Sequence, residues 1–246
     1  MKTMKNFILS TVLLVIFSVE VFAASGFEAI LNVPIGMGVG MPSKNEKEGD
    51  YKSGIGFDIG VTAQLGYMLQ VKQGFGISLL GEIGYSHDTY AITWKDGDNY
   101  VKSQEIYESF QIGLLPKFNI GAGPGTFSIG IGGGVKIPLA ITYKYDSKFG
   151  DNTSKDKEKV KMNEWKETYT PVIGYIKASF DYSIFLADQH AINVGLYLGY
   201  DIMPNYNSKT VKDFKEYDSD FKKSDNQSGS FDVGVQVGYR FGPKTI

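Results

Sequence analysis

The stretch TFSIGIGGGVKIPLAITYKY, residues 126–145, decides the fold because large apolar residues alternate along it with small or polar ones. Successive side chains of a β-strand point to opposite faces, so this period of two predicts a strand with one apolar and one polar face. The apolar positions are Phe127, Ile129, Ile131, Val135, Ile137, Leu139, Ile141, Tyr143 and Tyr145, and the others are Thr126, Ser128, Gly130, Gly132, Gly134, Lys136, Thr142 and Lys144.

The same alternation recurs in seven further segments, at residues 27–41, 55–71, 75–85, 106–120, 172–184, 192–202 and 231–241. The connections between them are alternately long and short. Short ones lie near residues 72–74, 121–125 and 186–189, and long ones span about 42–53, 95–105, 146–167 and 204–229. This pattern predicts an all-β fold, an eight-stranded antiparallel up-and-down transmembrane β-barrel with short periplasmic turns and long extracellular loops.

The apolar faces are expected to meet lipid, since one small barrel cannot bury eight of them inside itself. The other faces then fill a lumen that is normally too narrow for an ion path. Because the first and last strands are neighbours in a closed barrel, Glu28 and Arg240 are expected to meet at the periplasmic end. Buried charges need partners, so we expect a salt-bridged plug with a lumen charge network of Glu28, Asp58, Glu82, Lys117, Lys136, Lys177, Asp181, Asp232 and Arg240.

Four prolines fall within the expected strands. Proline lacks the N–H that a sheet ladder needs, so we expect local bulges there. They are Pro34, Pro116, Pro138 and Pro171.

The N-terminus has the features of a secretory signal peptide. Lys2 and Lys5 precede a mostly apolar run at residues 7–17, and Val21 and Ala23 are small residues at the positions that a signal peptidase reads. The run is shorter than the roughly 20 residues of a membrane anchor. We therefore expect a signal peptide at residues 1–23 and a barrel domain at residues 24–246.

Composition narrows the function further. The chain has no cysteine and a formal net charge of −2, so it offers no thiol nucleophile or cysteine metal site, and nothing favours a nucleic-acid partner. No metal-ligand spacing or phosphate-binding loop is present, and we expect no cofactor and no catalytic residue.

With these features the sequence resembles the small outer-membrane β-barrel family, which includes the membrane domain of outer-membrane protein A and short adhesin-like relatives. Its last strand ends Val237-Gly238-Tyr239-Arg240-Phe241, similar to the family's C-terminal assembly signal, although residues 242–246 follow here. The resemblance implies the outer membrane of a diderm bacterium as location. It also implies outer-membrane lipid and the barrel-assembly machinery as partners.

Three functions stay open. The first is a non-enzymatic surface barrel with an envelope role or loop-mediated adhesion to a host or envelope ligand. The second is a lipid-modifying enzyme, because the family contains acyltransferases and deacylases that use a histidine. His87 adjoins Ser86 and Asp88, but adjacent side chains on a strand cannot all face one way. The third is a soluble lipocalin-like carrier, whose apolar face would have to point inward.

Overall fold

The fold was analysed in a computed structural model that describes residues 25–245. The expected signal peptide at residues 1–23 lies outside the described residues, so its presence and the domain boundary that follows from it stay predictions. The elements of the described part are β1 (Gly26–Met41), α2 (Lys44–Glu48), β2 (Lys52–Ser53), β3 (Ile55–Lys72), β4 (Phe75–Asp96), β5 (Asn99–Leu114), β6 (Lys117–Ala122), β7 (Gly125–Phe149), β8 (Asn152–Val160), α3 (Met162–Thr168), β9 (Ile173–Ala187), β10 (His190–Ile202), α4 (Ser208–Tyr217), η1 (Lys223–Asn226) and β11 (Gly229–Phe241).

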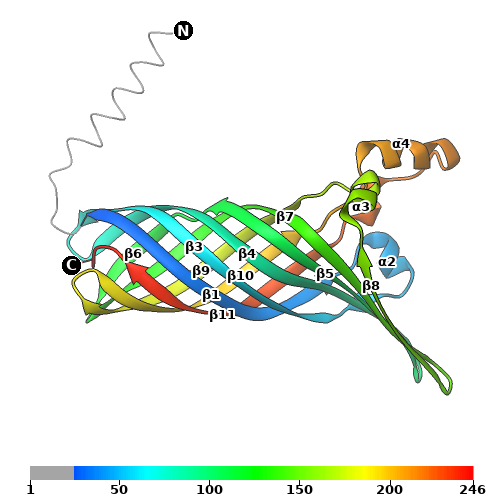
Figure 1. The fold of residues 1–246 in the computed structure, drawn as a ribbon, viewed down its shortest axis with the longest axis horizontal. Helices are drawn as coiled ribbons and strands as arrows, with labels where there is room; N and C mark the ends of the chain where they lie inside the picture. Colours follow the sequence, from blue (N-terminus) through cyan, green and yellow to red (C-terminus); the bar gives the residue numbers. More distant parts are fainter. Residues whose placement is uncertain (1–24, 246) are drawn as a thin grey trace, which may run out of the picture.

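The long strands close into a ring, which confirms the predicted barrel (Figure 1). Antiparallel pairing runs from β4 through β3, β1, β11, β10, β9 and β7 to β5, and β5 pairs back with β4. β6 continues β5, because both pair with β4 and β7, so the ring has eight places. The ring therefore has no unpaired edge, which is what a β-structure in hydrocarbon requires.

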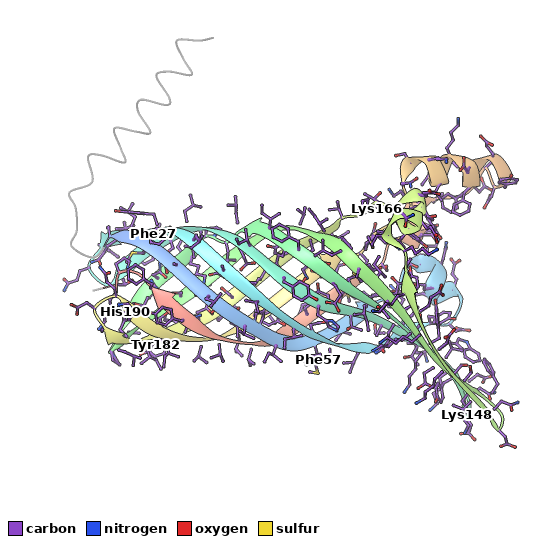
Figure 2. All side chains as sticks on the ribbon, viewed as in Figure 1. Phe27, Phe57, Lys148, Lys166, Tyr182 and His190 are labelled. Atoms are coloured by element: carbon purple, nitrogen blue, oxygen red, sulfur yellow. The ribbon has the colours of Figure 1, made fainter. Side chains whose placement is uncertain are left out.

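The wall has an apolar outside and a polar inside. Figure 2 shows Phe27, Phe57 and Tyr182 projecting outward from the wall, and Ile131 leaves 64% of its surface exposed. Small and polar residues of the same strands are buried on the inner side. Among the described residues, no helix has the length and apolar content needed to cross a membrane.

A β-bulge forms at Pro138, as expected. Opposite β5, Ser109 pairs with Pro138 and Glu108 pairs with Ala140, so Leu139 is an extra residue in β7. An extra residue reverses the alternation of every side chain after it.

This reversal corrects one sequence-based expectation. Ile141, Tyr143 and Tyr145 were expected on the lipid face with Ile131, but they lie on the side that continues the inner wall. Ile141 is 1% exposed and packs against Tyr107 in a buried cluster.

The other prolines behave differently from expectation. Pro34 sits in an unbroken register with β11, and Pro116 separates β5 from β6 while the register on either side stays the same. Pro171 lies before β9. The expected bulges at these three prolines were therefore wrong: a proline at a gap or before a strand removes a hydrogen bond without adding a residue.

Two of the expected long loops are largely strand. β4 and β5 run on to a tight turn at Gly97, which has φ +57°, and β7 runs on to Phe149 and pairs with β8. The four strands β4, β5, β7 and β8 form a sheet that projects beyond the barrel mouth (Figure 1). With α2, α3, α4 and η1 it builds an ordered layer over that end of the barrel, here called the loop layer.

Candidate functional site

The lumen holds every residue of the predicted charge network. Alternation along the strands points these side chains inward, and all are buried. They are Glu28, Asp58, Glu82, Lys117, Lys136, Lys177, Asp181, Asp232 and Arg240.

Ion pairs join seven of these residues at successive heights of the lumen. At the end with the short turns, Arg240 Nε lies 2.9 Å from Glu28 Oε1. The contact is an ion pair without hydrogen-bond alignment, since neither atom has a hydrogen-bond partner. Three further pairs are Lys117 Nζ with Asp181 Oδ2 at 2.9 Å, Lys177 Nζ with Glu82 Oε2 at 3.1 Å, and Lys136 Nζ with Asp201 Oδ2 at 2.6 Å.

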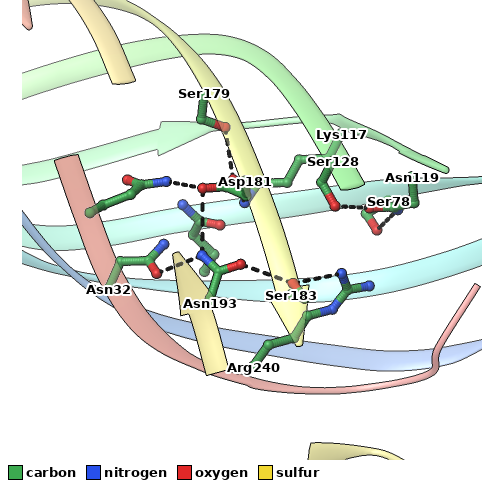
Figure 3. Close-up of polar contacts among 12 residues, drawn as sticks. Asn32, Ser78, Lys117, Asn119, Ser128, Ser179, Asp181, Ser183, Asn193 and Arg240 are labelled. Carbon is green, nitrogen blue, oxygen red and sulfur yellow. Dashed lines mark hydrogen bonds and ion pairs between the residues drawn. The ribbon is translucent and has the colours of Figure 1, made fainter. Parts of the chain in front are cut away.

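Asp181 is the centre of the most extensive polar network (Figure 3). Besides Lys117, its carboxylate accepts hydrogen bonds from Gln236 Nε2 and, at 3.1 Å, from Ser179 Oγ. Asn193 of β10 links this group to β1, two strands away in the ring, by donating to Asn32 Oδ1 at 3.0 Å. A buried network with its members bonded to one another makes a rigid interior, because removing one member leaves the others without partners.

The outer half of the lumen is acidic. Lys136 lies among four aspartates, of which Asp201 and Asp88 contact its ammonium directly, Asp88 at 3.0 Å. Asp58 accepts instead from the Thr89 backbone N–H at 2.8 Å, and the fourth aspartate is Asp232. Carboxylate oxygens of Asp88, Asp201 and Asp232 lie within 4.8 Å of one another, and the lysine ammonium provides the positive charge beside them.

Asp88 and Asp201 belong to this network but are not among the residues predicted from the sequence. Asp201 follows the inward alternation of β10, but Asp88 lies in the part of β4 where the apolar alternation is irregular. Both reach Lys136 only through the pairing of the strands. Their proximity to Lys136 could therefore not be predicted from the local sequence pattern.

The lumen is filled rather than open. The cavity that Lys136 and its aspartates line has a volume of about 50 Å³, which is room for one or two water molecules at about 30 Å³ each. At the other end the C-terminal residues fold against the wall: the Gly242 N–H donates to Gln189 O at 2.9 Å, and Thr245 is buried.

The residues around His87 lie on two sides of the wall. Ser86 Oγ donates to Asp88 Oδ2 at 2.6 Å inside the lumen. His87 points outward, where its Nδ1 lies 2.7 Å from Glu108 Oε1 and where Tyr85 also donates to Glu108. The wall therefore separates the histidine from the neighbouring serine and aspartate.

The closed ring, its apolar outer face and its ion-paired interior define a small outer-membrane β-barrel. A lipocalin-like carrier would need the reverse arrangement, with its apolar residues around a cavity. The short turns and both ends of the described chain lie at one end, and the loop layer lies at the other (Figure 1).

Scans of the sequence against protein-family models and against curated proteins gave no match. Solved structures with a similar strand arrangement include the Neisserial surface protein A, at 12% identity, 87% coverage of this chain, 97% of that chain and a TM-score of 0.35. The attachment invasion locus protein Ail of Yersinia pestis matches at 12% identity, with coverages of 87% and 98% and a TM-score of 0.31. The outer membrane protease OmpT of Escherichia coli matches at 8% identity, with coverages of 92% and 99% and a TM-score of 0.35.

At these identities and TM-scores, the similarities add no support to the assignment of a small outer-membrane β-barrel. It depends on the strand pairing and on the two faces of the wall.

Proposed function

We propose that this barrel is a non-enzymatic surface protein whose loop layer binds phosphate groups of the surrounding envelope lipid. The observation that supports this function is a lysine-rich face on the projecting sheet of β4, β5, β7 and β8. Strand register places on this one face, here called the lysine face, Lys95, Lys102, Lys144, Lys148, Lys155, Lys157 and Lys159.

The opposite face of the same sheet carries no lysine. It holds aromatic and acidic side chains instead, among them Trp94, Phe149, Asp156 and Glu158. Trp94 and Phe149 pack with their ring centroids 6.1 Å apart. A charge separation between two faces of one sheet favours a partner of negative charge on the lysine face.

Like charges lie directly opposite each other on the lysine face. Lys144 pairs across the strands with Lys157, an arrangement that destabilises a sheet unless an anion lies between the two ammonium groups. Two acidic residues, Asp146 and Asp156, lie nearby, and Asp146 Oδ2 is 3.6 Å from Lys155 Nζ. An open hollow of about 460 Å³ adjoins these residues and Lys102, which leaves room for a phosphate group.

The lysine face continues the outer side of the barrel wall. Below it on that side lie the apolar residues that meet lipid, such as Phe110 and Tyr85, and Lys148 lies near the tip of the projecting sheet (Figure 2). Lysines just above the hydrocarbon are within reach of phosphorylated headgroups, and such basic groups contribute about 1 kcal/mol each at an anionic surface.

Retention of the detergent-solubilised barrel on immobilised lipopolysaccharide tests this function. We expect retention at low salt and release at high salt, because the attraction is screened by ions. The double variant Lys144→Gln/Lys157→Gln should elute at lower salt than the unmodified protein. Lys209→Gln/Lys212→Gln, which removes the same charge from α4, should elute with the unmodified protein.

Two outcomes would contradict the proposal. One is equal elution of both double variants. The other is retention on immobilised heparin but not on lipopolysaccharide, which would make a sulfated glycan the partner in place of envelope lipid.

The separation of His87 from Ser86 and Asp88 supports a non-enzymatic role. Deletion of the gene should leave the acyl pattern of lipid A unchanged, and a change that His87→Ala reproduces would favour the enzyme instead. Assembly of the strand ending at Phe241 by the barrel-assembly machinery is part of the proposal, because that strand closes the ring by pairing with both β1 and β10.

A further inference from the structure

A second cavity lies in the loop layer, on the side of the projecting sheet opposite the lysine face. It has a volume of about 200 Å³. Drug-sized ligands occupy pockets of roughly 300–1,000 Å³, so this cavity fits a small ligand or a single headgroup. β4, β5 and β7 form its floor, and residues of α2, α3 and η1 and of the segment 203–206 form its walls.

Aromatic rings form much of the lining. Trp165 of α3 is 4% exposed and stacks on Tyr169 with ring centroids 5.1 Å apart. Tyr169 stacks in turn on Tyr206 at 5.3 Å, and Tyr107 and Trp165 form a T-shaped pair at 6.4 Å. The bulge at Leu139 adds Tyr143 by turning it to this side. Aromatic faces carry partial negative charge and attract cations.

The charged residues of the lining are all acidic. They are Glu46 and Glu105, and neither lysine nor arginine lines the cavity. Glu46 accepts from the Tyr90 hydroxyl at 3.0 Å, and Glu105 accepts from the Tyr107 hydroxyl. Burial raises the pKa of Glu105 to about 7; the Tyr107 hydrogen bond opposes this shift and the charge of Glu46 adds to it.

Trp165 supplies an independent sign of a ligand. Its Nε1–H is buried and has no hydrogen-bond partner. Burial raises the pKa of the Tyr143 hydroxyl and the nearby Trp165 N–H opposes that rise, but the two groups do not form an aligned hydrogen bond. A buried donor without a partner costs about 1–3 kcal/mol, so this wall of the cavity has one N–H left for an acceptor oxygen of a ligand.

We infer that this cavity binds a quaternary ammonium compound that carries an oxygen acceptor, such as choline. The carboxylates of Glu46 and Glu105 balance the charge of the cation beside the aromatic lining, and the oxygen of the ligand accepts from the Trp165 Nε1–H. An aromatic lining with nearby carboxylates suits this class of ligand, because a quaternary ammonium has no N–H to donate and is weakly hydrated. The inference rests on the proposed function only in placing the loop layer at the cell surface. It concerns a ligand of opposite charge at a separate site.

Tryptophan fluorescence gives a direct test, because Trp94 and Trp165 are the two tryptophans of the chain. In Trp94→Phe, the remaining tryptophan reports on the cavity alone. The refolded barrel in a nonionic maltoside, which contains no ammonium group, is titrated with choline and with tetramethylammonium. We expect a saturable change in Trp165 emission with both cations and none with 3,3-dimethyl-1-butanol, the neutral analogue of choline.

Matched variants test the role of the carboxylate. Glu105→Gln in the Trp94→Phe background should weaken choline binding at least tenfold, whereas Glu158→Gln, an exposed change on β8, should leave it unchanged. Phosphocholine in place of choline distinguishes a lipid or glycan headgroup from a free amine: binding at least as tight as choline indicates the headgroup, and weaker binding indicates the free cation.

The inference is overturned if neither cation gives a saturable change, or if the neutral analogue gives the same change as choline. These outcomes do not depend on any Glu105 variant folding. They also do not depend on the lysine face, because retention on lipopolysaccharide is measured separately and either proposal can fail without the other.

Discussion

Arg240 of the last strand and Glu28 of the first are an ion pair across the seam that closes the barrel. Their nearest charged atoms are 2.9 Å apart, and both side chains are buried. Strand pairing places Ile30 opposite Arg240, so Glu28 reaches the guanidinium from two residues away. The same ion pair therefore belongs to the charge network of the lumen and joins the two strands that close the ring.

Replacing Arg240 by Leu should destabilise the barrel strongly. Glu28 would be left buried without its charge partner, and breaking a buried pair in this way costs about 3–5 kcal/mol. The double variant Glu28→Leu/Arg240→Leu should recover most of the loss, since no lone charge remains. Urea unfolding in lipid vesicles, followed by gel migration without boiling, measures both; equal instability of the single and double variants would contradict the pairing argument.

Gly66 and Gly81 should respond differently to substitution by alanine. A Cβ at Gly66 would fall on the backbone oxygen of Leu79, well inside contact distance, whereas a Cβ at Gly81 meets only Leu65 O at 3.7 Å. Overpacking of this kind costs about 3 kcal/mol, so Gly66→Ala should lower the fraction of the protein that folds into the barrel. Gly81→Ala is the matched control and should fold as the unmodified chain does.

The filled lumen should not conduct ions. The pairs of Lys117 with Asp181 and of Lys177 with Glu82 cross it at successive heights, so a planar bilayer containing the barrel should show no discrete conductance steps. A general porin in the same bilayer serves as the positive control. Reproducible steps that scale with the amount of folded barrel would mean that the pairs open.

The loop layer should lose stability as the pH rises from 4.5 to about 7. Burial raises the pKa of Glu105 above its ordinary value of 4.5 to about 7, so the folded state holds a proton that the unfolded state has released. Glu105 therefore favours the folded layer at low pH, and this contribution, at most about 3 kcal/mol, is lost as the pH rises through the folded pKa. The titratable groups that interact with it are Glu46, Tyr90, Tyr107, Tyr143, Tyr145 and Tyr169.

Thermal unfolding of the loop layer measures this effect. In Trp94→Phe, the midpoint temperature of the change in Trp165 emission should decrease as the pH is raised from 4.5 to about 7. Glu105→Gln should remove most of the dependence. The assignment would be contradicted if, in the protein that retains Glu105, the midpoint temperature did not change with pH or increased with pH.

The sequence predicted the barrel wall well because lipid exposure imposes a simple rule on it. Each strand must present apolar side chains to hydrocarbon at every second position, so the alternation of Ile129 and Ile131 with Ser128 and Gly130 can be read directly. The inward charges follow from the same parity, which is why Lys117 and Asp181 were both named before any register was known.

The rule fails where the wall leaves the membrane. The bulge at Leu139 shifts the parity of β7, and no residue beyond it is constrained by lipid, so Tyr143 was assigned to the wrong face. The strands beyond Lys95 and Asp146 were expected to be loops because their mixed charges look the same on a solvated strand and on a coil. Cross-strand register between strands that are distant in sequence, as between Lys102 of β5 and Asp146 of β7, is not visible in the local pattern.

Quenching of a single tryptophan at position 131 by brominated lipid tests the central claim most directly. Ile131 lies on the outer wall and is 64% exposed, so Ile131→Trp in a Trp94→Phe/Trp165→Phe background should place an indole in hydrocarbon. Strong quenching by lipids brominated along their acyl chains, with blue-shifted emission, is the expected result. Emission that brominated lipid does not quench would show that this face does not meet the bilayer, and the membrane barrel would be the wrong assignment.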